Sequence, residues 1–191
     1  MIKKEIRILG IDDGYFEKFK SKYSKVVGVI FRGGKFIDGL ISFDVEVDGD
    51  DATEKIANAI NKSKHKGQIG IIMINGISLA GFNIIDIELL SKLTSLPVII
   101  VSRKKPRLNL IKKTLKKINQ EKKIKLIEKA GKPKPFIINN KKIYYQFFNI
   151  DEEKVKEILK LTIKRGLMPE PLRVAHIIAS GITLGENKGR V

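Results

Sequence analysis

Alternating and continuous apolar positions near the start of the chain predict three β-strands. Residues 5–11 and 26–31 are short apolar runs of the kind that forms buried strands. Residues 36–47 alternate apolar and polar side chains over their second half, which is typical of a strand. The pair Gly33-Gly34 between the last two runs is a hairpin signal. We therefore expect the three strands to form an antiparallel meander.

Helix and strand patterns then alternate. They predict helices over residues 52–63 and 83–93, and buried strands over residues 69–74 and 97–101. The β-α-β-α-β order from residue 36 to residue 101 implies right-handed crossovers and an α/β sheet. Three antiparallel strands followed by a helix, a strand, a helix and a strand are the element order of a ribonuclease H-like fold. We expect a mixed sheet with flanking helices.

The second half of the chain carries further helix and hairpin signals. They predict a helix from Leu108 to Ile118, a hairpin of residues 136–138 and 143–148, a helix after Asp151 that runs to about Arg165, and a last helix that starts after Pro169-Glu170-Pro171 and stops at Gly181. The tail, about residues 182–191, is expected to be flexible. No repeat or linker interrupts the sequence, so we expect a single domain over residues 1–191.

The composition excludes several kinds of site and of protein. The chain has 191 residues, 42% of them hydrophobic, which is enough for one globular core. The absence of cysteine excludes disulfides and zinc–thiolate sites, and two histidines argue against a multi-histidine metal centre. No apolar run is long enough for a membrane span, and the N-terminus lacks a signal-peptide pattern. We expect a soluble, cytoplasmic protein.

Charge is both large and unevenly placed. The formal net charge is +17, which favours nucleic acid, DNA or RNA, as a partner. Residues 36–61 hold seven acids and one base, whereas residues 103–142 hold sixteen bases and two acids. An acidic segment within a basic protein suggests a cation site beside a track for a polyanion. The alternative is that the lysines only solvate the surface, because many lie on the polar face of a predicted helix.

Two carboxylates end the first predicted strand. Asp12 and Asp13 follow the apolar run directly, and aspartate is a poor strand former that is costly to bury without a partner. At the end of a central strand such a residue needs a cation, a helix N-terminus or a basic side chain. The alternative is a solvated turn, since Asp13-Gly14 is a common turn dipeptide.

Two stretches resemble endonuclease V. The sequence Pro-Glu-Pro-Leu-Arg-Val-Ala-His at residues 169–176 is similar to a Pro-Glu-Pro-Thr-Arg-x-Ala motif of that family, and Gly10-Ile-Asp12 resembles its Gly-Val-Asp. A broader similarity, over nearly the whole chain, is to an archaeal family catalogued as domain of unknown function number ninety-nine. That similarity rests on Asp48-Gly-x-Asp51-Ala-Thr53, Gly81-Phe-Asn83, Leu96-Pro-Val98 and the Pro-Glu-Pro block. It implies an endonuclease V-like fold.

The resemblance implies a site for Mg²⁺ or Mn²⁺. Asp12 matches the metal-binding aspartate of the first strand, and either Asp48 or Asp51 takes the place of a glutamate after the third. Asn75 stands where endonuclease V has a further aspartate, so this position supplies an oxygen without a charge. Asp86 is an alternative source of the missing charge.

The resemblance also implies residues that act on the phosphate and the proton. Arg103, with Lys104 beside it, takes the place of a catalytic lysine, and His176 follows the Pro-Glu-Pro block. A packing role is the alternative for His176, which shares a helix face with apolar residues. The leading hypothesis is a divalent-metal-dependent hydrolase of nucleic-acid phosphodiesters. The alternatives are a non-catalytic nucleic-acid-binding or scaffold protein of the same fold, and an enzyme acting on a small phosphate compound.

Overall fold

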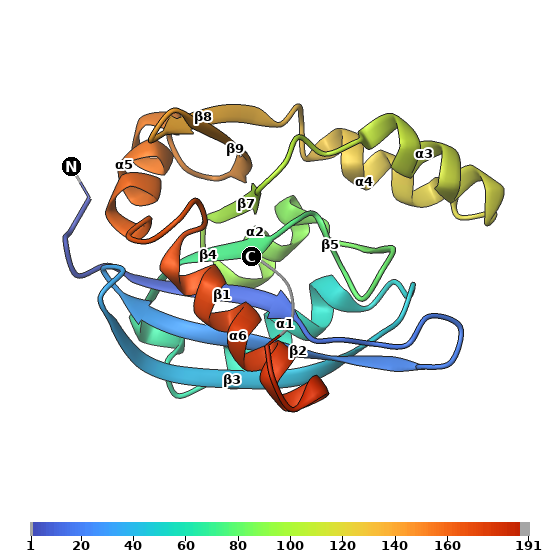
Figure 1. The fold of residues 1–191 in the computed structure, drawn as a ribbon, viewed down its shortest axis with the longest axis horizontal. Helices are drawn as coiled ribbons and strands as arrows, with labels where there is room; N and C mark the ends of the chain where they lie inside the picture. The colour runs from blue at the N-terminus through green and yellow to red at the C-terminus, as the bar shows by residue number, and fades with distance from the viewer. Residues whose placement is uncertain (1, 188–191) are drawn as a thin grey trace.

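The computed structural model describes residues 2–187 and is built around a mixed seven-stranded sheet (Figure 1). The order across the sheet is β3-β2-β1-β4-β7-β9-β8. The strands are β1 (Arg7–Asp13), β2 (Tyr23–Arg32), β3 (Phe36–Glu46), β4 (Ile69–Asn75), β7 (Val98–Ser102), β8 (Lys134–Ile138) and β9 (Lys141–Phe148). The pairs β1–β4 and β4–β7 are parallel and the other pairs are antiparallel. The predicted meander, parallel strands and late hairpin are confirmed.

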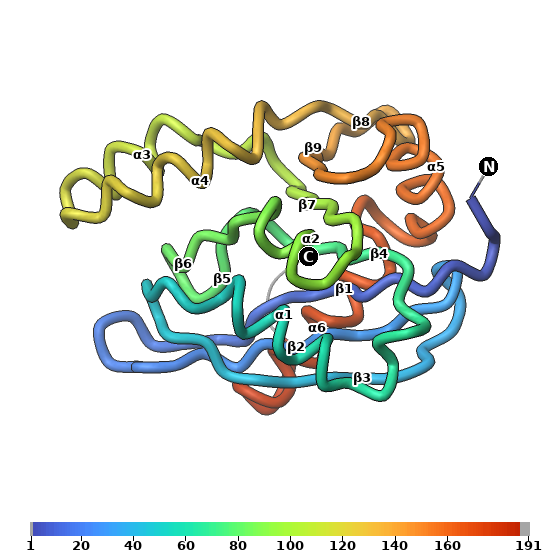
Figure 2. Tube along the Cα trace, turned by 180° about the vertical axis from the view of Figure 1, so that it is seen from behind, coloured from blue at the N-terminus to red at the C-terminus, as the bar shows by residue number. Residues whose placement is uncertain are grey.

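Helices cover both faces of this sheet. One face packs against α1 (Ala52–Lys62) and α2 (Ile87–Thr94), and the other against α5 (Glu152–Thr162) and α6 (Glu170–Leu184). Apolar residues of α3 (Leu108–Lys117) and α4 (Ile124–Lys129) join the core on the α1 side. Successive residues of β1 divide between the faces, since Ile8 packs with the α5 side and Leu9 with the α1 side. In Figure 1, α6 crosses in front of β1 and β2, and Figure 2 shows α1 and α2 from behind.

Two projections extend from the same side of the molecule. We call residues 108–129, which contain α3 and α4, the α3–α4 arm; the other projection is the β1–β2 connection (Figures 1 and 2). A small hairpin of β5 (Ser78–Leu79) and β6 (Asn83–Ile84) follows β4. No helix among residues 2–187 is long and apolar enough to cross a membrane.

The second predicted helix begins later than its apolar pattern indicates. Asn83 and Ile84 form strand β6, and α2 begins only at Ile87. Asp86 explains the shift, because its side chain accepts hydrogen bonds from the backbone N–H groups of Glu88 and Leu89 and so caps the helix. The prediction of a helix from residue 83 was therefore wrong by one turn.

The last helix is longer than predicted. It continues through Gly181 to Leu184 and ends at Gly185, whose φ of 79° is the left-handed conformation that favours glycine at a helix end. The backbone N–H of Gly185 donates to the carbonyl of Gly181. The expected tail therefore includes three residues, 182–184, that are helical, while residues 188–191 lie outside the described part of the chain.

Candidate functional site

Asp12 lies at the centre of a hydrogen-bonded cluster at the carboxyl end of β1. Its side chain is buried, with 3% exposure. Its Oδ2 accepts a hydrogen bond from Asn75 Nδ2 at 3.0 Å and lies 3.0 Å from His176 Nδ1. Asn75 ends β4, the parallel neighbour of β1, and His176 lies in α6. Three of the predicted site residues, from distant parts of the sequence, thus meet at one carboxylate.

Close approach of α6 to β1 places His176 there. A Cβ atom on Gly10 would lie 2.4 Å from the backbone carbonyl of Pro171, so only glycine allows the helix to pack this closely. The first turn of α6 is held by Glu170 and Arg173, whose carboxylate and guanidinium are 2.6 Å apart. The Pro-Glu-Pro block therefore positions the first turn of α6 against β1.

Asp13, beside Asp12, faces the other side of the sheet. Its Oδ2 accepts a hydrogen bond from the backbone N–H of Ala80 at 2.8 Å. Burial and the neighbouring charge of Asp12 raise the pKa of the Asp13 carboxyl to about 7. The resemblance carried over Asp12 alone; the Asp12-Asp13 doublet itself was the signal that both carboxylates share the strand end.

Asp48 is fixed to the same loop as Asp13. Its backbone N–H donates to the Ala80 carbonyl at 2.9 Å, and its Oδ1 accepts from the backbone N–H of Phe82 at 2.7 Å. Its own backbone is in the left-handed region, at φ 56°. A Cβ atom on Gly81 would lie 2.3 Å from Asp48 Oδ1, so glycine is needed for this contact. Residues 80–82 therefore connect Asp13 to Asp48.

Asp51 has a different environment. Its Oδ1 accepts from Asn83 Nδ2 at 2.7 Å and from the backbone N–H of Glu46 at 3.1 Å. Although Asp51 occupies the N-cap position of α1, Asn83 Oδ1 instead accepts the bond from the backbone N–H of Ala52. The Asp51 side chain therefore does not cap its own helix, because it is bonded to Glu46 and Asn83.

Asp86 does not supply the charge missing at Asn75. One of its oxygens caps α2, and the other lies 3.1 Å from Lys129 Nζ. Within residues 2–187, no group of three or more histidine, aspartate or glutamate side chains is placed to hold a metal ion. The hydrogen-bonded cluster offers one carboxylate, one amide and one imidazole.

Lys123 is a site residue that the sequence did not reveal. It lies in a short 3₁₀ turn (Glu121–Lys123) of the α3–α4 arm, and its side chain is 2% exposed. Its Nζ donates to the carbonyls of Asp48, Gly49 and Phe82 at 2.7–2.9 Å, and lies 3.1 Å from Asp50 Oδ1. This ammonium ties the arm to both loops that surround Asp48.

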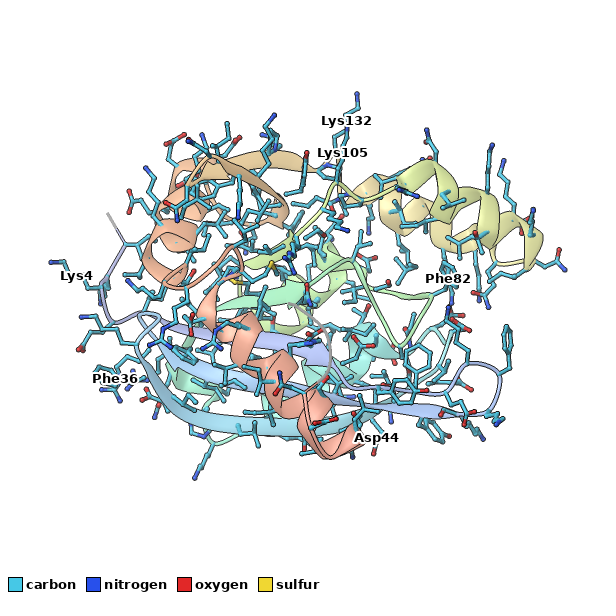
Figure 3. The ribbon with its side chains drawn as sticks, viewed as in Figure 1. Lys4, Phe36, Asp44, Phe82, Lys105 and Lys132 are labelled. Atoms are coloured by element: carbon cyan, nitrogen blue, oxygen red, sulfur yellow. The ribbon has the colours of Figure 1, made fainter. Side chains whose placement is uncertain are left out.

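Arg103 follows β7 and lines a cavity of about 350 Å³. Its other basic lining residues are Lys141, Arg165 and Arg173, and Ile177 of α6 closes one side. Arg103 comes two residues after Val101, the partner of Asn75 in the β4–β7 pairing, so it follows the strand next to the one that carries Asn75. The other predicted phosphate residue, Lys104, is exposed. Further lysines stand at the base of the arm, where Lys105 and Lys132 point outward (Figure 3).

Solved structures share this fold. A protein of unknown function from Archaeoglobus fulgidus superposes with a TM-score of 0.83 at 33% identity, over 93% of this chain and 98% of that one. Endonuclease V of Bacillus subtilis gives 0.59 at 13% identity, over 91% and 78%. Endonuclease V of Ciona intestinalis, solved with an inosine-containing DNA 24mer, gives 0.58 at 17% identity, over 90% and 83%. The predicted ribonuclease H-like, endonuclease V-like fold is confirmed.

Sequence relatives cover nearly the whole length of the chain. A UPF0215 protein of Thermococcus sibiricus is 48% identical over 98% of this chain and 97% of its own length. A UPF0215 protein of Methanothermobacter thermautotrophicus is 45% identical over 98% and 93%. The model of the family described as endonuclease dU matches residues 4–183. The predicted likeness to an archaeal, endonuclease V-like family is confirmed, and the chain belongs to the endonuclease dU family.

Proposed function

We propose that this protein is a divalent-metal-dependent endonuclease that hydrolyses a phosphodiester bond of nucleic acid. The observation that carries the proposal is the buried Asp12 carboxylate, which shares one oxygen with Asn75 and His176 at the carboxyl edge of two parallel strands. Ligands of α/β proteins bind at this edge. The family description points to DNA that contains deoxyuridine as the first substrate to test.

The donor set fits a hard dication such as Mg²⁺ or Mn²⁺. Asp12 would hold the ion through its carboxylate and Asn75 through its amide carbonyl. Asp48, which residues 80–82 join to Asp13, is the second carboxylate that the resemblance implies. Mg²⁺ is commonly bound through one or two carboxylates together with water and substrate phosphate, so a small protein donor set suffices. When bound, such an ion activates water and neutralises charge on the phosphate.

The chain's own groups have separate tasks in this proposal. Arg103, in the basic cavity, binds the phosphate and stabilises the charge that develops on it, with Lys104 as a further contact. His176 is oriented by the contact of its Nδ1 with Asp12 and transfers the proton. Asp12, His176 and Arg103 therefore act on the ion, the proton and the phosphate respectively.

Two measurements test the proposal. Calorimetric titration with Mn²⁺ should give binding to the wild type and none to Asp12→Asn. End-labelled DNA containing a single deoxyuridine should be cut in Mg²⁺ or Mn²⁺, but not in EDTA and not by Asp12→Asn. The control is Asp44→Asn, an exposed carboxylate of β3 paired with Lys25, which should behave as wild type. Equal Mn²⁺ affinity of wild type and Asp12→Asn would refute the metal site.

A second candidate function is a non-catalytic nucleic-acid-binding protein of the same fold. It is favoured by Asn75, which donates a hydrogen bond to Asp12 where a further acid would add charge, and by the lack of a three-acid cluster within residues 2–187. This candidate predicts nucleic-acid binding that is equal in EDTA and in Mg²⁺. It also predicts no cleavage of deoxyuridine, inosine or unmodified strands by the wild type.

A further inference from the structure

The β1–β2 connection presents one fully exposed aromatic side chain. Phe19 has a relative exposure of 103% and a φ of 65°, a conformation that is unusual for a bulky residue. Hydrogen bonds hold the turn around it: the backbone N–H groups of Lys20 and Ser21 donate to the carbonyl of Glu17, and the Ser21 hydroxyl accepts from the Glu17 N–H. The turn is thus built to hold Phe19 in water, at a cost in backbone strain.

Lysines and further aromatic side chains surround Phe19. Lys18, Lys20 and Lys22 are exposed, and Lys20 neutralises Glu17 at 2.6 Å. At the two ends of the connection, Tyr15 is 55% exposed and Tyr23 is 52% exposed. Lysine is depleted from protein–protein interfaces, whereas aromatic residues among cations are the usual surface for unpaired nucleic acid.

The connection is anchored next to the Asp12 cluster. It starts directly after Asp13, and the backbone N–H of Gly14 donates to the Lys25 carbonyl at 2.7 Å. The backbone N–H of Tyr15 donates to Thr183 Oγ1 of α6 at 3.0 Å, so the connection is tied to the same helix that carries His176. The base of the connection is therefore held beside the end of the strand that carries Asp12.

We propose that Phe19 stacks on an unpaired base of the strand that the Asp12 cluster acts on, while Lys18 and Lys22 contact its phosphates. The proposal rests on nucleic acid being the partner, as the proposed function states. Stacking on a phenyl ring does not depend on base identity, because every base offers a π-face. The contact therefore selects an unstacked base over a paired one, not one base over another.

The test measures binding without metal, so that hydrolysis plays no part. In EDTA, fluorescence anisotropy gives the affinity for a single strand and for a paired duplex of the same sequence. Phe19→Ala should weaken single-strand binding about 5- to 150-fold, the range found when a stacked aromatic is removed, and leave duplex binding unchanged. Phe19→Trp should retain single-strand binding. A 2-aminopurine placed in the single strand should be quenched by the wild type and not by Phe19→Ala.

Lys18→Ala is the matched control, because it removes a neighbouring charge from the same turn. It should lower the salt dependence of binding to the single strand and to the duplex, and it should not affect the quenching of 2-aminopurine. Equal single-strand affinity of wild type and Phe19→Ala overturns the stacking role, and so does an equal loss for strand and duplex. If Phe19→Ala loses binding to anionic lipid vesicles and keeps its binding to nucleic acid, the stacking role is also overturned, and the turn is assigned to membranes. A wild type that binds strands but never cuts them refutes the hydrolase alone.

Discussion

Replacing Lys123 with methionine should destabilise the protein more than any other single lysine change in the α3–α4 arm. Methionine keeps most of the side-chain volume but removes the ammonium. The carbonyls of Asp48, Gly49 and Phe82 then lose a common donor whose side chain is only 2% exposed. Unpaired buried acceptors carry their full desolvation cost, which is the reason to expect a large effect.

The size of the effect follows from the geometry. A hydrogen bond to a charged group contributes about 1.5–3 kcal/mol, and three that share one donor are not additive. Removing one partner of a buried charged contact costs about 3–5 kcal/mol, and we take this as the expected loss. For a chain of this length, 1 kcal/mol corresponds to about 2–4 °C in Tm, so Lys123→Met should lower Tm by about 6–20 °C.

Lys122→Met is the matched control for this measurement. Lys122 precedes Lys123 and also pairs with Asp50, at 2.7 Å, but its side chain is 75% exposed. An exposed ion pair contributes about 0–1 kcal/mol, so this variant should unfold close to wild type in urea and on heating. If Lys123→Met unfolds within about 1 kcal/mol of Lys122→Met, the bonds of the buried ammonium contribute little and the reasoning fails.

Three further predictions concern the site itself. Asn75→Asp should tighten Mn²⁺ binding by calorimetry, because it adds a charge beside Asp12; unchanged affinity would place the metal elsewhere. The raised folded pKa of Asp13 means that the native state holds a proton that the unfolded state releases, so stability should fall as pH rises from about 4 to about 7. Asp13→Asn should flatten that fall in urea unfolding at about pH 5 and about pH 8, and an unchanged slope would contradict it. Changing Arg103, Lys104 and Lys105 together to alanine should reduce the slope of log affinity against log salt by about 0.9 for each duplex phosphate that these side chains neutralise, whereas an unchanged slope would assign their charges to solvation.

Most of the sheet could be predicted because its strands are defined by local apolar runs and turns. The apolar run before Asp12 and the hairpin at Gly33-Gly34 can be recognised from local sequence alone, without information on distant residues. Helix ends were predicted less well, since they depend on which polar group forms a particular bond. Asp86 caps α2, so the helix begins only at Ile87. The last helix continues through Gly181 and ends at Gly185.

Three residues of the Asp12 cluster could be named from the sequence, but their connections to the rest of the site could not. Resemblance brought Asp12, Asn75 and His176 together, and their contacts are those of one cluster. The choice between Asp48 and Asp51 depends on loop conformation, which no periodic pattern encodes. Lys123 was hidden for another reason, because Lys122 and Lys123 are the same residue type in one basic run and only the folded turn buries one of them.

The contact between β1 and α6 joins the first strand of the chain to its last helix. Asp12 and His176 are separated by 164 positions. Pro171 can pack against Gly10 only after residues 169–184 have been synthesised. A nascent chain on the ribosome carries Asp12 without its imidazole partner, and so does a chain truncated before α6. The cluster is therefore complete only after α6 has been synthesised, and a product terminated before α6 lacks it.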